Sequence, residues 1–222
     1  MDVISGERRV GIIVMAKAPV EGRSKTRMVP PLTTWQAAEV AAAALADTLA
    51  AVGSTPGVRR ILAVDGDLAD PPPRGFHVIP QRGETLADRL TAALEDAAPP
   101  AVAISADTPQ ITRELLTAAA REITRPGVDA ILGPSPDGGY WAIGLREFHP
   151  AVFHDIPMSR PDTFTRQRNR LVELGLSVAI LPSLRDADFF DDALAIAEQI
   201  PTSRFAEAVR RFHQAHVGEE TA

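Results

Sequence analysis

Short apolar runs alternate with longer amphipathic segments along almost the whole of this 222-residue chain. Short runs bounded by turn residues are typical of buried parallel strands, and the segments between them are long enough for helices. Strands that alternate with helices pair in parallel and are covered by helices on both faces of the sheet. The sequence therefore predicts an α/β fold, a three-layer α/β/α sandwich with a mostly parallel sheet.

Strands are expected at residues 10–16, 60–64, 76–80, 101–106, 129–133, 140–145 and 176–181. Helices are expected at residues 33–52, 84–97, 115–123 and 161–174, and over the remainder to residue 213. A glycine-rich turn between residues 134 and 140 joins strand to strand, which predicts a locally antiparallel, mixed part of the sheet. Because no repeat, linker or composition shift interrupts the pattern, we expect one domain over residues 1–222, with a core of about 10–193 and C-terminal helices at 189–213.

The composition excludes several kinds of site. The chain has no cysteine, so disulfides, thiolate metal sites and cysteine nucleophiles are absent, and its five histidines are scattered. Any metal would be a hard ion held by oxygen ligands. The net charge of -6 argues against nucleic-acid binding. No signal peptide is recognisable, and no stretch approaches the ~20 apolar residues of a membrane-spanning helix. We therefore expect a cytoplasmic protein.

The apolar run that begins at Ala101 ends abruptly in Asp107, Thr108 and Pro109. Pro109 prevents helical continuation at Thr108, so the chain turns and holds the Asp107 carboxylate at the end of a central strand. Open α/β sheets bind their ligands at that edge. The alternative is that Asp107 caps the helix that begins near Thr112, since Asp is a favoured cap. The local pattern leaves both open.

A basic segment follows the first expected strand directly. Its cations are Lys17, Arg23, Lys25 and Arg27. Lys and Arg bind phosphate oxygens, and Gly22 lets the backbone approach them. The segment matches neither the Walker loop nor the dinucleotide glycine pattern. A solvated basic loop is the alternative interpretation.

A glycine-rich turn and two aromatic residues form a third candidate. Gly138 and Gly139 follow Asp137 and permit positive φ and exposed amides, while Tyr140 and Trp141 can stack on a ring. A tight Asp-Gly turn with aromatic core residues would give the same pattern.

Two further stretches are charged. Asp186 and Asp188 follow the last expected strand, where they can supply a metal ligand beside Asp107 or simply cap a helix. The segment from Gln81 to Arg89 opens a helix, whose N-terminal amides attract anions, although Arg89 can be a plain surface charge. Four of these five stretches follow strands, so one binding cleft at the carboxyl edge of the sheet is expected.

The order of several short motifs resembles a known family. They are Met15–Pro19, Gly22–Arg27, Ser105–Pro109, Gly133–Tyr140, Ile143–Leu145, Ile156–Pro157 and Leu184–Asp188. Together they resemble the GT-A-type nucleotide-diphospho-sugar transferase superfamily. Within it, the chain is similar to bacterial glycosyltransferase-like proteins related to the phospholactate guanylyltransferase of coenzyme F420 synthesis.

The resemblance implies a Rossmann-like GT-A domain that binds a nucleotide at the carboxyl edge of its sheet. It implies that Lys25 and Arg27 contact the phosphates, and the nucleotide contacts expected at this edge are Ala16, Lys17, Gly22, Arg23, Lys25, Arg27, Arg82 and Ser105. It further implies Mg²⁺ or Mn²⁺ held by Asp107 and by Asp188, or alternatively Asp186. Gly138, Gly139 and Tyr140 would face the sugar or acceptor, and the catalytic residues would be Asp107, Lys25 and Asp137.

The function expected on this basis is a metal-dependent transferase that uses an activated nucleotide, with glycosyl transfer from a nucleotide sugar preferred. One alternative is nucleotidyl transfer from an NTP, such as GTP, to a small phosphorylated acceptor. Another is a non-enzymatic nucleotide-binding module. The expected partners are the nucleotide or nucleotide sugar and a small acceptor. Neither nucleic acid nor a membrane span is expected, and both a monomer and a homo-oligomer are compatible with the sequence.

Overall fold

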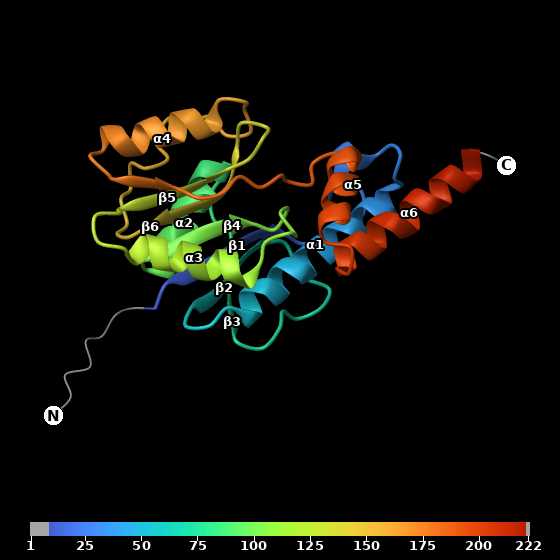
Figure 1. The fold of residues 1–222 in the computed structure, drawn as a ribbon, viewed down its shortest axis with the longest axis horizontal. Helices are drawn as coiled ribbons and strands as arrows, with labels where there is room; N and C mark the ends of the chain where they lie inside the picture. The colour runs from blue at the N-terminus through green and yellow to red at the C-terminus, as the bar shows by residue number, and fades with distance from the viewer. Residues whose placement is uncertain (1–8, 221–222) are drawn as a thin grey trace.

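The strands form a single seven-stranded sheet in the computed structural model, which describes residues 9–220 (Figure 1). The strand bounds are β1 (Gly11–Lys17), β2 (Arg59–Asp65), β3 (Phe76–Pro80), β4 (Ala101–Ser105), β5 (Ala130–Pro134), β6 (Tyr140–Leu145) and β7 (Val178–Ile180). Their order across the sheet is β3-β2-β1-β4-β6-β5-β7. Strand β6 is antiparallel to β4 and β5, and the other neighbours are parallel. The mixed, mostly parallel sheet confirms the predicted α/β class.

Helices cover both faces of this sheet. The helix bounds are α1 (Thr34–Ser54), α2 (Leu86–Ala97), α3 (Arg113–Thr124), α4 (Thr163–Glu173), α5 (Phe190–Gln199) and α6 (Arg204–Glu220), of which α5 and α6 lie beside the sheet. Alternate residues of β1 point to opposite faces, so Ile12 packs with α1 and α3 while Ile13 packs with α2. The central strands are apolar on both sides because each side is covered.

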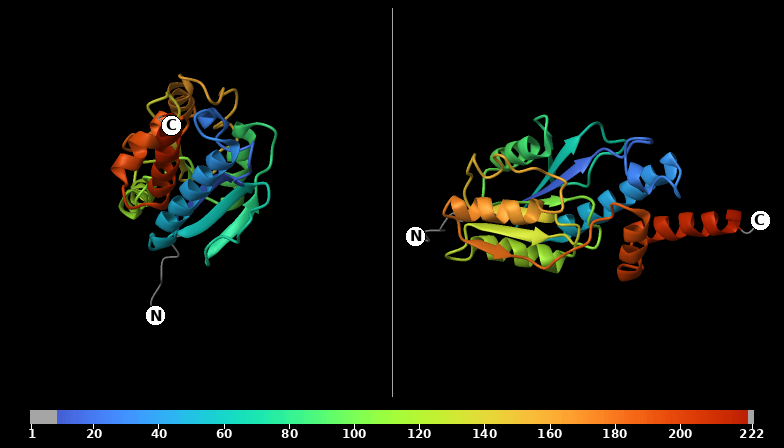
Figure 2. Two further views of the ribbon diagram at one scale, coloured as in Figure 1. Left: turned by 90° about the vertical axis from the view of Figure 1, so that its right-hand side faces the viewer. Right: turned by 90° about the horizontal axis from the view of Figure 1, so that it is seen from above.

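A third apolar cluster lies beside the sheet. Buried side chains of α1, α5 and α6 form it, including Val40, Ile196 and Phe205. Figures 1 and 2 show α5 and α6 beyond the edge of the sheet, against the N-terminal part of α1. The C-terminal helices therefore extend the core through α1 and do not cover a face of the sheet.

Helix α1 corrects one expectation. With 21 residues and a mean hydropathy of 1.3, it is long and apolar enough, by length and composition, to cross a membrane. It is held by protein on two sides, however, packing against the sheet through Leu45 and Leu49 and against the C-terminal helices through Val40. A core helix meets the same test of length and composition, and we interpret α1 as one.

The segment after β7 also differs from its expectation. Residues 182–189 were expected to be helical but are irregular. Their backbone bonds to the sheet region instead: Leu184 N donates to Pro134 O at 3.1 Å and Ala187 N donates to Asp107 O at 2.9 Å. These tertiary hydrogen bonds take the place of helical ones and hold the segment along the carboxyl ends of the strands.

The chain changes direction between β1 and β4. After β1 it adds β2 and β3 on one side of β1, and it then returns to place β4 on the other side. This point, where adjacent strands connect in opposite directions, leaves a crevice at their carboxyl ends in open α/β sheets. The residues that directly follow β1 and β4 therefore meet there.

Candidate active site

A cleft of about 980 Å³ opens at this crevice. It is lined by most of the residues predicted for the site, namely Ala16, Lys17, Arg23, Lys25, Arg27, Ser105, Asp107, Asp137, Gly139, Tyr140 and Asp188. These side chains come from the ends of β1, β4 and β5, the start of β6 and the segment after β7. One cleft thus collects four separate motifs of the sequence.

Lys25 lies at the floor of the cleft. Its backbone is left-handed, with φ 49°, just before a short 3-10 helix at Thr26–Met28. Such a conformation is uncommon for a residue with a Cβ and is often found at ligand sites. Only 7% of the Lys25 side chain is exposed, and Nζ is 2.8 Å from Asp107 Oδ1 and 3.9 Å from Asp188 Oδ1. The basic segment is therefore not a freely solvated loop at this residue.

Asp107 is positioned by its backbone. Its N–H donates to Ser105 Oγ at 3.0 Å, and its carbonyl accepts from Ala187 N at 2.9 Å. The cap of α3 is Thr112, whose side chain accepts from Leu115 N. Asp107 is consequently not the cap of that helix, and its carboxylate faces the cleft.

Asp188 is held by the segment after β7. The buried Trp141 anchors this segment by donating from Nε1 to Pro182 O at 3.0 Å. Asp188 Oδ2 accepts from Arg27 at 2.7 Å, and the same guanidinium lies 5.8 Å from the Phe189 ring centroid. Phe189 N donates to Asp192 at the start of α5, so Asp188 does not cap that helix.

Asp186 adds negative charge to the same wall. Its half-buried carboxyl has a pKa raised to about 6, first by desolvation and then by the neighbouring carboxylates of Asp137 and Asp188. Lys25 opposes the shift more weakly. This wall is therefore mainly negative, with several carboxylates around the enclosed ammonium of Lys25.

The turn that precedes β6 lines the cleft beside the segment that carries Asp186. Asp137 Oδ1 accepts from Gly139 N at 2.8 Å, so the predicted tight turn forms while Asp137 still lines the cleft. Tyr140 lies beside Met158 and Gln167, and burial raises the pKa of its hydroxyl well above the ordinary value. Trp141, at 2% exposure, packs mainly in the core.

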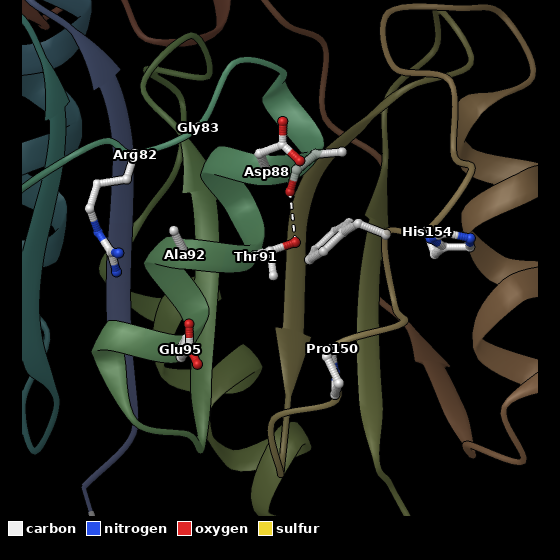
Figure 3. Close-up of a pocket in the computed structure, with 10 residues that line it drawn as sticks. Arg82, Gly83, Asp88, Thr91, Ala92, Glu95, Pro150 and His154 are labelled. Carbon is white, nitrogen blue, oxygen red and sulfur yellow. Dashed lines mark hydrogen bonds between the residues drawn. The ribbon is translucent and has the colours of Figure 1, made fainter.

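Three predicted contacts lie outside the lining of this cleft. Gly22 shapes the basic segment with φ 72°, and Gly138 turns toward the backbone of Pro161. Arg82 lines a separate hollow of about 410 Å³ between α2 and the segment that contains Pro150 and His154 (Figure 3).

Figure 3 shows the Arg82 side chain running along α2. Its guanidinium pairs with Asp96 at 2.6 Å, and this partner raises the pKa of Arg82. Arg82 is therefore held against α2, outside the lining of the cleft that contains the basic segment.

Several lining residues were not predicted as contacts, and three of them hold or line the cleft with amide or guanidinium groups. Gln81 donates both amide N–H groups, to Ala16 O and Ala63 O at 2.9 Å each, which fixes the ends of β1 and β2. Arg89 pairs with Asp65 at 2.7 Å. Arg160 lines the wall beside Tyr140. The position of Gln81 directly after β3 is the signal that could have identified it.

The donors present fit a hard divalent ion. Among residues 9–220 no group of three or more carboxylates or imidazoles is arranged to hold a metal by itself. Mg²⁺, however, usually takes one or two protein carboxylates and completes its shell with waters and phosphate oxygens. Asp107 and Asp188 both approach one point, the Lys25 ammonium, within 4 Å. An ion that arrives with phosphates is therefore compatible with this pair.

Comparison with solved structures identifies the fold. A candidate nucleotide-diphospho-sugar transferase from Desulfovibrio desulfuricans is similar over 95% of this chain and 97% of its own, with 23% identity and a TM-score of 0.83. The 4-diphosphocytidyl-2C-methyl-D-erythritol synthase of Anaerococcus prevotii is similar over 86% and 96%, with 11% identity and a TM-score of 0.54. A nucleotidyl transfer enzyme from Methanothermobacter is similar over 87% and 98%, with 13% identity and a TM-score of 0.54. The protein has a nucleotide-diphospho-sugar transferase-like fold, as the motifs implied.

The sequence also places the chain in a family. It belongs to the DUF2064 family of uncharacterised proteins conserved in bacteria, whose model matches residues 48–160. That region contains Asp107 and Asp137 but neither Lys25 nor Asp188. No curated protein matches the chain significantly.

Proposed function

We propose that this protein is a metal-dependent transferase that uses an activated nucleotide, with glycosyl transfer from a nucleotide sugar as its reaction. The observation that carries the proposal is the enclosed Lys25 ammonium beside Asp107 and Asp188, in a cleft that also contains Arg23 and Arg27. Cations that bind phosphates and carboxylates that bind a divalent ion are the two parts that a nucleotide diphosphate requires. The full-length likeness to a candidate nucleotide-diphospho-sugar transferase supports the choice of donor.

The residues of the chain have distinct roles in this reaction. Arg23, Lys25 and Arg27 bind and orient the diphosphate, while Asp107 and Asp188 would hold the ion. When bound, Mg²⁺ or Mn²⁺ would offset the negative charge that develops on the leaving diphosphate.

Glycosyl transfer forms one bond and breaks another at the sugar. The acceptor hydroxyl attacks the anomeric carbon, the bond from that carbon to the diphosphate oxygen breaks, and the nucleoside diphosphate leaves with the electron pair. The proton of the hydroxyl requires a base within hydrogen-bond reach. Asp137 is our candidate, because its carboxylate lines the cleft and is oriented by the Gly139 amide.

Nucleotidyl transfer is a second candidate, and the charge of the cleft favours it. Four cations line the cleft after β1, which suits a triphosphate, and Arg160 on the acceptor side suits a phosphorylated acceptor. An acceptor phosphate oxygen would then attack the α-phosphorus and pyrophosphate would leave. That acceptor is already an anion, so positioning does most of the work and no base is needed.

The test is incubation with Mg²⁺ and panels of nucleotide sugars and NTPs. Release of nucleoside diphosphate from a sugar donor supports glycosyl transfer. Pyrophosphate release from an NTP with a phosphorylated acceptor, and no reaction of any sugar donor, would replace it with nucleotidyl transfer. Binding of nucleotides without any turnover would leave a non-enzymatic nucleotide-binding module.

A pair of variants tests the assignment of Asp107. Asp107→Asn removes the charge that holds the ion, and we expect it to lower metal-dependent turnover by about 10²-fold or more, the scale of losing a principal electrostatic group. Asp70→Asn is the matched control, because Asp70 is exposed on the loop between β2 and β3 and does not line the cleft. Substantial turnover by Asp107→Asn would contradict the mechanism.

A further inference from the structure

The charge at the floor of the cleft is arranged unusually for a metal site. Lys25 Nζ is enclosed and donates no hydrogen bond of acceptable geometry to a residue that the structure describes. Its contact with Asp107 Oδ1 at 2.8 Å is an ion pair alone. The Lys25 side chain is only 7% exposed, whereas the carboxylates that it approaches, Asp107 and Asp188, are 46% and 31% exposed. Lys25 is therefore a cation held within an anionic site.

The ammonium and a divalent ion would compete for the same space. Mg²⁺ requires its oxygen ligands at 2.0–2.1 Å. An ion at that distance from Asp107 Oδ1, on the side that faces Lys25 Nζ at 2.8 Å, would overlap the ammonium. Two cations so close would also repel each other strongly, since like charges a few ångströms apart interact by several kcal/mol near a protein surface. The two occupants therefore exclude each other.

The Lys25 side chain can leave its ion pair with Asp107. Its side chain is long and flexible, its backbone is already in the cleft, and Arg23 and Arg27 mark the neighbouring space as favourable for anions. Phosphate oxygens in that space would attract the ammonium away from Asp107 and leave that carboxylate without a cation, while Asp188 keeps the Arg27 guanidinium at 2.7 Å.

We propose that Lys25 and a divalent cation are alternative occupants of the space beside Asp107 and Asp188, so that the ion enters only when phosphates have drawn the lysine away. This inference rests on the proposed function, since it takes the phosphates to be those of a nucleotide. Its consequence is an ordered site: the free protein binds the metal weakly, and the nucleotide and the metal bind together. Lys25 acts here as a positioning residue that prevents premature metal binding.

The experiment measures Mn²⁺ binding to the protein without nucleotide, from the free-ion signal in electron paramagnetic resonance. Lys25→Met removes the ammonium and keeps an apolar chain of similar length, and we expect Mn²⁺ to bind roughly tenfold tighter or more. The chain offers a matched control, because Lys17 is its only other lysine and lines the same cleft from the end of β1. Lys17→Met removes the same charge and should change Mn²⁺ affinity much less.

A double variant tests the location of the ion. Lys25→Met with Asp107→Asn should lose the gain in affinity, because the carboxylate that receives the ion is then neutral. Circular dichroism and urea unfolding check that each variant folds, and Lys25→Gln, which keeps a polar side chain, is the second variant if Lys25→Met does not. Unchanged Mn²⁺ affinity in both Lys25 variants would overturn the inference, as would an equal gain in Lys17→Met.

A second measurement follows the lysine itself. Selective ¹³C labelling of lysine gives two side-chain Cε resonances, and the Lys25 variant assigns them. Inorganic pyrophosphate should shift the Lys25 resonance in the absence of metal, and a spectrum in which only the Lys17 resonance moves would contradict the exchange.

The two proposals fail separately. Turnover of a nucleotide donor together with unchanged Mn²⁺ binding by Lys25→Met overturns this inference and supports the proposed function. Tighter Mn²⁺ binding by Lys25→Met with no turnover of any donor supports the exchange and overturns the proposed function.

Discussion

Replacing Gly138 by alanine should push apart two segments next to the cleft, the turn before β6 and the segment that contains Pro161. Its φ is +91°, and a Cβ built on it would lie 1.9 Å from the carbonyl oxygen of Pro161. That contact is between two backbones, so no side-chain rotation relieves it. The Gly138 carbonyl also accepts a hydrogen bond from Phe164 N at 2.8 Å, which joins the same two segments.

Gly138→Ala should therefore destabilise the protein through three separate effects. The left-handed backbone costs about 1–2 kcal/mol for a residue with a Cβ. The clash adds about 1–3 kcal/mol, as for overpacking, and loss of the Phe164 hydrogen bond adds about 1–3 kcal/mol if its groups stay buried. We expect a total decrease of about 3–8 kcal/mol in the free energy of unfolding.

Gly175→Ala is the matched control. Gly175 has a φ of +77° but nothing within 4 Å of the added Cβ, so it loses only the backbone contribution. The change in unfolded-chain entropy is the same in both variants and cancels in their difference. Urea unfolding measures both, and a difference of about 2 kcal/mol or more is expected. If the two variants lose the same stability, the close approach of Gly138 and Pro161 does not constrain these segments.

Three other substitutions test the local causes of the site. Asp186 has a folded pKa of about 6, above its ordinary 3.8, so its favourable contribution is present below about pH 4 and is lost as the pH rises through 6. The shift corresponds to roughly 3 kcal/mol, which solvent screening of this half-buried group reduces to about 1–2 kcal/mol. Asp186→Asn should raise the melting temperature at pH 8 and leave it unchanged near pH 4; equal effects at both pH values would contradict the repulsion. Thr112→Ala should lower the free energy of unfolding by about 1 kcal/mol in urea, because it removes the cap of α3. A negligible loss would reopen the capping role of Asp107. Trp141→Phe should cost about 1–3 kcal/mol in the same assay by leaving Pro182 O without its donor, and an unaltered midpoint would show that this bond does not anchor the segment.

The carboxyl edge of the sheet was predictable because it follows from topology. Asp107 and the basic segment each come directly after a strand, and parallel strands bring their carboxyl ends to one edge. The antiparallel strand β6 was predictable from its glycine-rich connection, since Gly138 permits the turn that returns the chain beside β5.

Other features of the site depend on contacts between distant segments. The local sequence predicts the start of a helix at residues 182–189. Their amide groups instead donate to β5 and to Asp107, and no local pattern indicates these long-range hydrogen bonds. Arg82 was placed among the nucleotide contacts by resemblance, but its nearest carboxylate is Asp96 of the following helix. Gln81 was passed over because a neutral amide carries no charge signal, although its two hydrogen bonds hold the ends of two strands.

The enclosure of Lys25 shows most clearly how the site depends on the whole fold. A lysine in a loop with three other cations would ordinarily extend into water, because burial of an unpaired ammonium is costly. Here the left-handed backbone turns the side chain inward, and the carboxylates that compensate it come from β4 and from the segment after β7, 82 and 163 residues further along the chain. The hydrogen bond from Ala187 N to Asp107 O helps to bring the two carboxylates together. The same hydrogen bond therefore supports both the pair that holds the lysine and the pair that would receive the metal, so the two proposed occupants depend on one contact between distant segments.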